Sequence, residues 1–201
     1  IGVRGIIEIP EAFIREQIDA VIVDIGADVV KTGMLSSVAI VRAVVDKIEE
    51  YGLDTIVVDP VMVAKSGDRL LKEDALTALR DLLLPKATVV TPNIPEAEVL
   101  TGRQISGISD SKQAARDLVA MGAISVVVKG GHLEGSATDV FYDGNEFIEF
   151  TKERIVTSNT HGTGCTFASA VAAGLAKGCQ PFEAVGIAKS YVTDAIRNGF
   201  S

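Results

Sequence analysis

The stretch "HGTGC" (161–165) combines residue types that suit anion binding with one that suits proton transfer or nucleophilic attack. The small residues that follow predict a helix over 163–177. The first N–H groups of a helix lack partners and carry partial positive charge, and glycine lets an anion approach them closely. We therefore expect an anion cradle at 162–165 that suits phosphate. Cys165 would lie on the first turn, where the same N–H groups favour its thiolate.

A single glycine-rich turn is weak evidence of function by itself. The alternative is a tight turn capped by Thr160 or Thr163, beside a buried structural cysteine. A cysteine hydrolase built on Cys165 and His161 is disfavoured, because both residues lie in one short loop and no orienting acid accompanies them.

Upstream of this loop, short β-branched apolar runs alternate with helical patterns. The runs cover 28–33, 55–60, 87–92 and 124–130, and the helical patterns cover 37–52, 72–85 and 110–122. Runs that are apolar on both faces are typical of a buried parallel sheet. A hairpin over 138–150 and helices over 163–177 and 181–198 complete the chain. This order predicts an α/β fold, a mostly parallel sheet with helices on both faces, in a single domain over 1–201.

Ligands of open α/β sheets bind beyond the carboxyl ends of the strands. In this chain those ends read "KTGM" (31–34), "DPVM" (59–62), "TPN" (91–93) and "KGGH" (129–132). Glycine and polar residues gather there, whereas the stretches between them are ordinary. The sequence therefore predicts a ligand site at this edge of the sheet.

Charge and cysteine content exclude several classes of function. The net charge is −8 without a Lys/Arg cluster, which disfavours binding to nucleic acid or to anionic membranes. No apolar run reaches the roughly 20 residues that cross a bilayer. The two cysteines, Cys165 and Cys179, lie at opposite ends of one predicted helix. We therefore expect unpaired, reduced thiols and a cytoplasmic protein.

Five motifs occur in a fixed order along the chain. "KTGML" (31–35), "DPVMVAKSGDRLL" (59–71), "TPNIPEAE" (91–98) and "VVKGGH" (127–132) precede "NTHGTGC" (159–165). Together they resemble the hydroxymethylpyrimidine/phosphomethylpyrimidine kinases of thiamine biosynthesis, which belong to the ribokinase-like superfamily. The resemblance covers nearly all 201 residues. Most of that superfamily has an aspartate base where this chain has Cys165, and a cysteine there resembles the pyrimidine kinases and a subset of pyridoxal kinases.

The resemblance implies phosphate transfer from ATP, with Mg²⁺, to 4-amino-5-hydroxymethyl-2-methylpyrimidine and then to its monophosphate. It implies that the catalytic residues are Gly162, Thr163, Gly164 and Cys165, with Cys165 as the base. It implies nucleotide and phosphate contacts for Asn93, Lys129 and His161. It implies a pyrimidine pocket formed by Gly33, Met34 and Val61. It implies that Glu96 and Asp59 are the residues on the metal-binding side of the site.

Each of these assignments has an ordinary alternative. Glu96 suits the first turn of a helix, Asp59 can cap the next turn, and Lys129 can be a solvated residue at a strand end. An apolar residue such as Met34 is more often plain core. The loop 64–68 is either a flap over the phosphates or a simple connection. The glycines after Lys129 imply a close backbone approach, which favours a functional role there.

Relatives of this kind carry an aspartate, a Gly-Gly loop and a substrate-contacting glutamine ahead of the stretch that residues 1–10 resemble. We therefore expect about 45–60 further residues, one or two β-α units, before this stretch. Two rival functions stay open: a pyridoxal kinase of the same fold, and an inactive pyrimidine-binding domain. Dimers are common among such kinases, so a homodimer is a further expectation.

Overall fold

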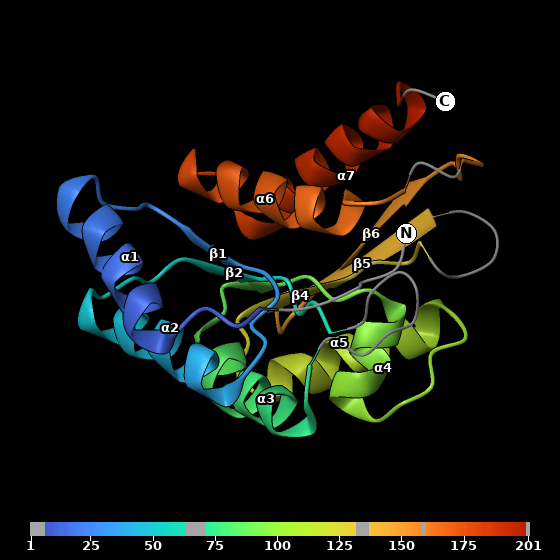
Figure 1. Cartoon of the computed structure of the whole chain (residues 1–201). Helices are drawn as coiled ribbons and strands as arrows, with labels where there is room; N and C mark the ends of the chain where they lie inside the picture. The colour runs from blue at the N-terminus through green and yellow to red at the C-terminus, as the bar shows by residue number, and fades with distance from the viewer. Residues whose placement is uncertain (1–6, 63–70, 132–136, 158–159, 200–201) are drawn as a thin grey trace.

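The computed structural model describes residues 7–62, 71–131, 137–157 and 160–199 (Figure 1). Its strands form one sheet in the sequential order β1 to β6. They are β1 (Val30–Thr32), β2 (Ile56–Val58), β3 (Val89–Val90), β4 (Ser125–Val128), β5 (Ala137–Tyr142) and β6 (Phe147–Lys152). Strands β1 to β4 are parallel, whereas β5 and β6 are antiparallel. This confirms the predicted mostly parallel sheet and the terminal hairpin.

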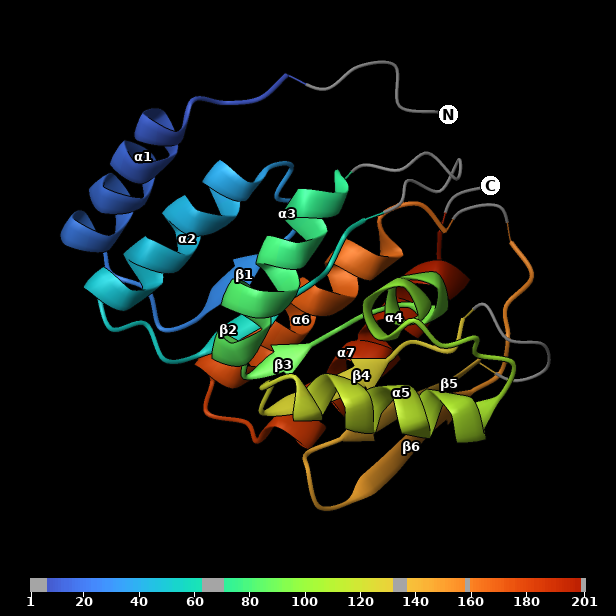
Figure 2. The same cartoon turned by 90° about the horizontal axis from the view of Figure 1, so that it is seen from below.

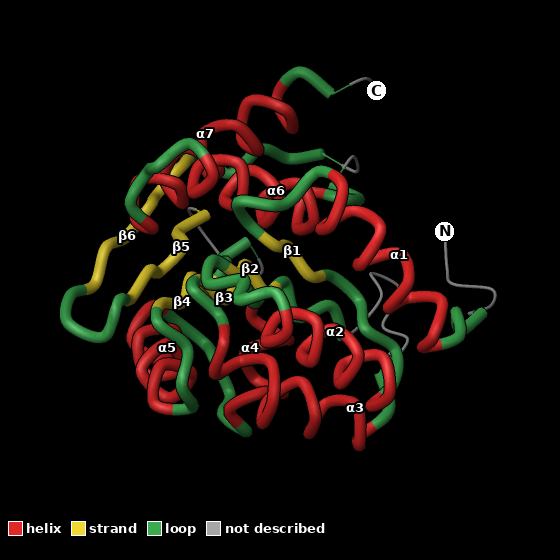
Figure 3. The backbone as a smooth tube through the Cα atoms, turned by 90° about the vertical axis from the view of Figure 1, so that its left-hand side faces the viewer, coloured by secondary structure: helices red, strands yellow, loops and turns green. Residues whose placement is uncertain are grey.

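Helices cover both faces of this sheet, as the sequence predicts (Figures 1 and 3). They are α1 (Glu11–Asp24), α2 (Val38–Glu50), α3 (Glu73–Ala78), α4 (Ile94–Thr101), α5 (Ile108–Ala120), α6 (Thr163–Ala176) and α7 (Pro181–Arg197). A π-helical turn (Leu79–Leu83) and a 3₁₀ turn (Leu84–Lys86) continue α3. Helices α2 to α5 lie on one face, and α6 and α7 lie on the other. Within the described ranges, no helix is both long and apolar enough to cross a membrane.

The valine-rich strands bury side chains on both faces, which explains their continuous apolar runs. One core cluster lies between the sheet and helices α2 to α5, and it includes Ile56, Val58, Val90, Val126 and Val128. The other lies between the sheet and helices α6 and α7, and it includes Val57, Val89, Val127 and Phe141. Successive strand residues thus alternate between the two clusters.

The strands are shorter than the apolar runs that predict them, but backbone pairing continues past their ends. Asp59 N–H donates to the carbonyl of Thr32 at 3.1 Å, and Thr91 N–H donates to Val58 at 2.9 Å. Lys129 N–H donates to the carbonyl of Pro92 at 2.8 Å. These bonds hold the carboxyl ends of four neighbouring strands in register, so the polar residues that follow them lie side by side.

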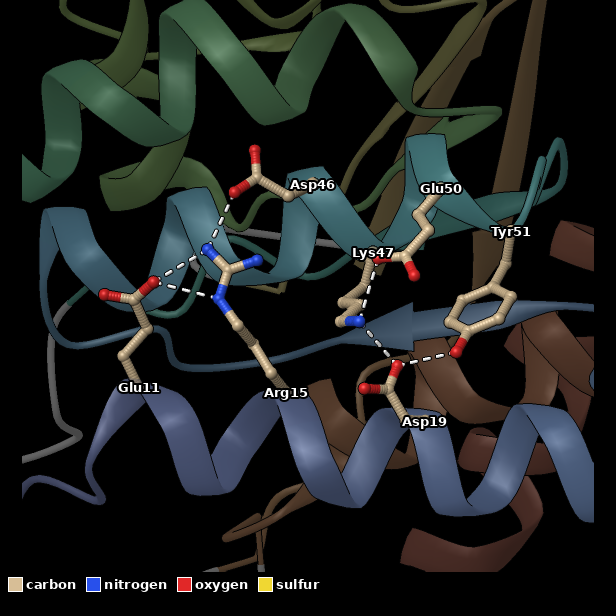
Figure 4. A network of polar contacts seen from close by, with 7 residues as sticks. All are labelled: Glu11, Arg15, Asp19, Asp46, Lys47, Glu50 and Tyr51. Atoms are coloured by element: carbon tan, nitrogen blue, oxygen red, sulfur yellow. Dashed lines mark hydrogen bonds and ion pairs between the residues drawn. The ribbon is translucent and has the colours of Figure 1, made fainter.

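The sequence analysis assigned no element to the stretch that forms α1. This helix packs on α2 at one side of the molecule (Figures 2 and 3), and none of its residues is buried. Polar contacts join the two helices: Arg15, which also pairs with Glu11 within α1, pairs with Asp46 of α2, and Lys47 pairs with Asp19 at 2.6 Å (Figure 4). A helix without a buried apolar stripe gives a weak periodic signal, so the sequence pattern did not reveal it.

Candidate active site

The carboxylate of Asp59 lies at the centre of the predicted ligand edge. It is 2% exposed, and its Oδ1 lies 3.2 Å from Lys129 Nζ and accepts a hydrogen bond from the Thr91 hydroxyl at 3.3 Å. Its Oδ2 lies 3.4 Å from Lys31 Nζ and has no hydrogen-bond partner among the described residues. Its contacts there are all with side chains, so the turn-capping alternative has no support in the described part of the chain. Asp59 instead lies between two ammonium groups.

Lys31 is the charged member of this group that the sequence pattern does not single out. A lysine in a β-branched run is usually a solvated side chain, and its proximity to Asp59 depends on the pairing of β1 with β2. The only local signal is its place at the start of the "KTGM" strand end.

Helix α6 begins as the glycine-rich loop predicts. Its N-cap is Gly162, whose φ of 81° lies in the left-handed region that glycine favours and which has no side chain to cap the helix. The Thr163 hydroxyl donates to the carbonyl of Thr160 at 2.9 Å. Both cysteines are unpaired; Cys165 is exposed, and Cys179 is partly buried. The alternative of a buried structural cysteine is therefore wrong.

Lys129 joins the helix start to the carboxylate. A methyl group on Gly164 would lie 3.4 Å from Lys129 Nζ, so this ammonium lies against the first turn of α6. The same ammonium donates to Asp59 Oδ1. The ends of β1, β2 and β4 and the start of α6 therefore meet at one place, although they are far apart in the sequence.

Glu96 and Asn93 begin α4 as a reciprocal pair. Asn93 Oδ1 accepts from Glu96 N–H at 2.9 Å, and Asn93 N–H donates to Glu96 Oε2 at 2.8 Å. The helix-start interpretation thus holds for the Asn93 side-chain oxygen and for one of the two Glu96 carboxylate oxygens. Burial raises the pKa of Glu96 from 4.5 to about 7; Lys129 opposes this rise and Asp59 adds to it. Glu96 is therefore electrostatically coupled to the charged group around Asp59.

The residues assigned to the pyrimidine pocket lie beside the same edge. Met34 is 36% exposed, so the plain-core alternative is wrong for it, whereas Met62 is buried in the core. Val61 is partly buried, and a methyl group on Gly33 would lie 3.3 Å from Lys31 Nζ. His161 is exposed in the turn before α6. The loop 64–68 lies outside the described residues.

The glycines after Lys129 have a different cause from the one we expected. A methyl group on Gly130 would overlap the carbonyl oxygen of Thr138 in β5, whereas one on Gly131 would meet nothing within 4 Å. Gly130 N–H also donates to Asp139 Oδ1 at 2.9 Å, and that buried carboxylate pairs with Lys189 of α7 at 2.9 Å. The close approach at Gly130 is therefore to the neighbouring strand, and it does not by itself indicate a ligand.

Known proteins share this fold. The chain superimposes on a phosphomethylpyrimidine kinase from Clostridium difficile with a TM-score of 0.85 and 39% identity, covering 97% of this chain and 80% of that one. It superimposes on the ADP complex of a pyridoxal kinase from Bacillus subtilis with a TM-score of 0.92 and 41% identity, covering 98% and 75%. These likenesses identify the fold as ribokinase-like.

Sequence comparison narrows this class to a family. The sequence model of the phosphomethylpyrimidine kinase family matches residues 1–201, and the chain belongs to that family. A thiamine biosynthesis bifunctional protein from Geobacter sulfurreducens is 51% identical over 98% of this chain. A hydroxymethylpyrimidine/phosphomethylpyrimidine kinase from Bacillus subtilis is 45% identical over 98% of it. The chain spans 40% of the first relative's length and 74% of the second's.

Alanine at Gly130 tests the strand contact at the site. We expect Gly130→Ala to lower the free energy of unfolding by about 1–3 kcal/mol, because its methyl group must displace β5. Gly131→Ala is the matched control and should stay within about 0.5 kcal/mol of wild type. Urea denaturation of the three proteins measures both effects. Equal stability of the two variants would show that the end of β4 is not tightly apposed to β5.

The pH dependence of stability tests the burial of Glu96. Because its folded-state pKa of about 7 exceeds the ordinary 4.5, the unfolded chain loses this proton at lower pH than the folded one. The contribution of Glu96 to stability is full below pH 4.5 and is lost as the pH rises through 7. Relative to Glu96→Gln, wild type should lose up to about 3 kcal/mol across this window without metal.

The control for this experiment is Glu183→Gln, because Glu183 occupies the same position in the exposed capping box of α7. The difference in free energy of unfolding between wild type and Glu183→Gln should show no comparable change between pH 4.5 and 7. Parallel stability profiles for wild type and Glu96→Gln between pH 4.5 and 7 would contradict the burial assigned to Glu96.

Proposed function

We propose that this chain transfers the γ-phosphoryl group of ATP to 4-amino-5-hydroxymethyl-2-methylpyrimidine and then to its monophosphate, which gives the diphosphate used in thiamine biosynthesis. The observation that supports this most is the meeting of Lys129, Asp59 and the start of α6 beside the exposed Cys165. The family membership and the names of the relatives support the same activity.

The roles of the residues follow from the needs of phosphoryl transfer, which is mostly positioning and charge neutralisation. The N–H groups at the start of α6 would hold the oxygens of the transferring group, with Gly164 allowing close approach. Lys129 would neutralise part of its charge. Cys165, on the first turn, would accept the proton of the attacking hydroxyl. Met34 and Val61 would contact the ring.

Asp59 and Glu96 form the side of the site that fits Mg²⁺. Asp59 Oδ2 is buried without a hydrogen-bond partner among the described residues, and Glu96 is a buried carboxyl whose raised pKa a nearby cation would lower. No group of three or more metal-binding side chains occurs in the part of the chain that the structure describes. Two carboxylates are enough for Mg²⁺, which proteins often bind through one or two carboxylates together with water and substrate phosphates. Bound Mg²⁺ would neutralise charge on the phosphates of ATP.

Pyridoxal kinase activity is the second candidate, because pyridoxal kinases are among the structures that this chain superimposes on at TM-scores near 0.9. The deciding experiment offers the pyrimidine alcohol and pyridoxal separately, with ATP and Mg²⁺, and measures initial rates. We expect faster phosphorylation of the pyrimidine. Faster phosphorylation of pyridoxal would overturn the proposal, and phosphorylation of neither would favour an inactive binding domain. A cytoplasmic location and a homodimer stay predictions.

The two phosphorylations should depend differently on Cys165. The alcohol must lose a proton as it attacks, whereas a dianionic monophosphate has no proton to lose. We expect Cys165→Ala to slow the first step by about 10²–10⁴-fold, the usual range for loss of a general base, and to slow the second step much less. Single-turnover measurements with each acceptor give both rates.

Cys179→Ala is the matched control, because it removes the other free thiol beyond the far end of α6 and should leave both rates near wild type. Cys165→Asp should recover part of the loss in the first step. If Cys165→Ala phosphorylates the alcohol within about threefold of wild type, well below the range for base removal, the thiol is not the base.

A further inference from the structure

Lys31 presents a second ammonium group at the site, on the side away from Lys129. Its Nζ lies 3.4 Å from Asp59 Oδ2, and its side chain is 21% exposed. A methyl group on Gly33 would lie 3.3 Å from this Nζ, so the ammonium bends over the strand end that carries Gly33 and Met34. Lys129 Nζ, in contrast, lies against Gly164. The two lysines therefore flank one carboxylate, one on the pocket side and one on the side of α6.

The contact with Asp59 leaves Lys31 able to bind another anion. The 3.4 Å ion pair is long, and Asp59 Oδ2 has no hydrogen-bond partner among the described residues. An ammonium group has three donors, and this side chain is partly open to solvent. Two lysines and one aspartate carry a net charge of +1. Such a group attracts a dianionic phosphate monoester and makes no comparable interaction with a neutral alcohol.

We propose that Lys31 binds the phosphate group of the monophosphate substrate and is a specificity residue for the second phosphorylation. This inference rests on the proposed function, because the same pocket must accept the neutral alcohol first and its dianionic product next. Lys129, beside the start of α6, serves the transferring phosphoryl group in both steps. Lys31 serves the acceptor, and it matters most when the acceptor is charged.

The chemistry of the second step shows why such a residue is needed. A phosphate oxygen of the acceptor forms a bond to the γ-phosphorus of ATP as the bond from that phosphorus to the β,γ-bridging oxygen breaks. The electron pair of the broken bond leaves with ADP. The dianionic acceptor releases no proton, so no base is required. The obstacle is instead repulsion between two phosphate groups, which a cation beside the acceptor reduces.

The first test compares kcat/KM for the two acceptors in wild type and Lys31→Met. We expect the ratio of monophosphate to alcohol to fall roughly 10- to 100-fold, the equivalent of one lost charge-assisted hydrogen bond. Lys31→Arg, which keeps the charge, should restore part of the ratio. Lys86→Met is the matched control: Lys86 forms a 2.6 Å ion pair with Glu49 and should leave the ratio unchanged.

The second test measures the dissociation constants of the alcohol and the monophosphate by calorimetry in the absence of nucleotide. Lys31→Met should weaken binding of the monophosphate by more than tenfold relative to binding of the alcohol. It should also reduce the salt dependence of monophosphate binding. This readout does not depend on turnover, so it separates a failure of the inference from a failure of the proposed function.

If Lys31→Met lowers kcat/KM and binding affinity equally for both acceptors, the inference is overturned. Lys31 would then serve only as the ion-pair partner of Asp59. If wild type phosphorylates neither acceptor, the proposed function fails. The dissociation constants then decide the inference. An unchanged ratio of monophosphate to alcohol affinity in Lys31→Met would overturn it, and a selective loss of monophosphate binding would support it.

Discussion

The buried carboxylate of Asp59, held between two ammonium groups, is the interaction on which the rest of the site depends. A lone buried carboxylate costs several kcal/mol in lost hydration, so it persists only where cations or hydrogen-bond donors lie beside it. Lys31 approaches one oxygen at 3.4 Å, and Lys129 and Thr91 approach the other at 3.2 Å and 3.3 Å. The fold must therefore hold the ends of β1, β2, β3 and β4 together. The backbone bonds that continue past the strands do this.

This arrangement makes a cationic site in an acidic protein. The chain carries a net charge of −8, yet Lys31 and Lys129 outnumber the one aspartate between them, and the start of α6 adds partial positive charge. Glu96 adds less negative charge than an ordinary carboxylate, because its burial raises its pKa to about 7. Anions are thus attracted to this edge of the sheet.

Much of this was predictable from the sequence, because buried parallel strands and glycine-rich helix starts leave local patterns. The alternation of elements, the hairpin and the ligand edge all follow from such patterns. The rest depends on contacts between distant segments. Helix α1 has no buried residues to mark it, Lys31 gains its significance only from the pairing of β1 with β2, and Gly130 is needed for Thr138 of the next strand. The exposure of Cys165 likewise depends on how α6 packs. The assigned roles of the site residues stay predictions.

A double-mutant cycle on Asp59 and Lys129 tests most directly whether this carboxylate organises the site. The measured quantity is the free energy of unfolding of wild type, Asp59→Asn, Lys129→Met and the double variant, by urea denaturation at pH 8. Without Asp59 the two lysines repel each other, so removing Lys129 should then be less destabilising than in wild type. We predict that the double variant is more stable than the sum of the single losses by more than about 0.5 kcal/mol. Losses that add within about 0.5 kcal/mol would contradict the account.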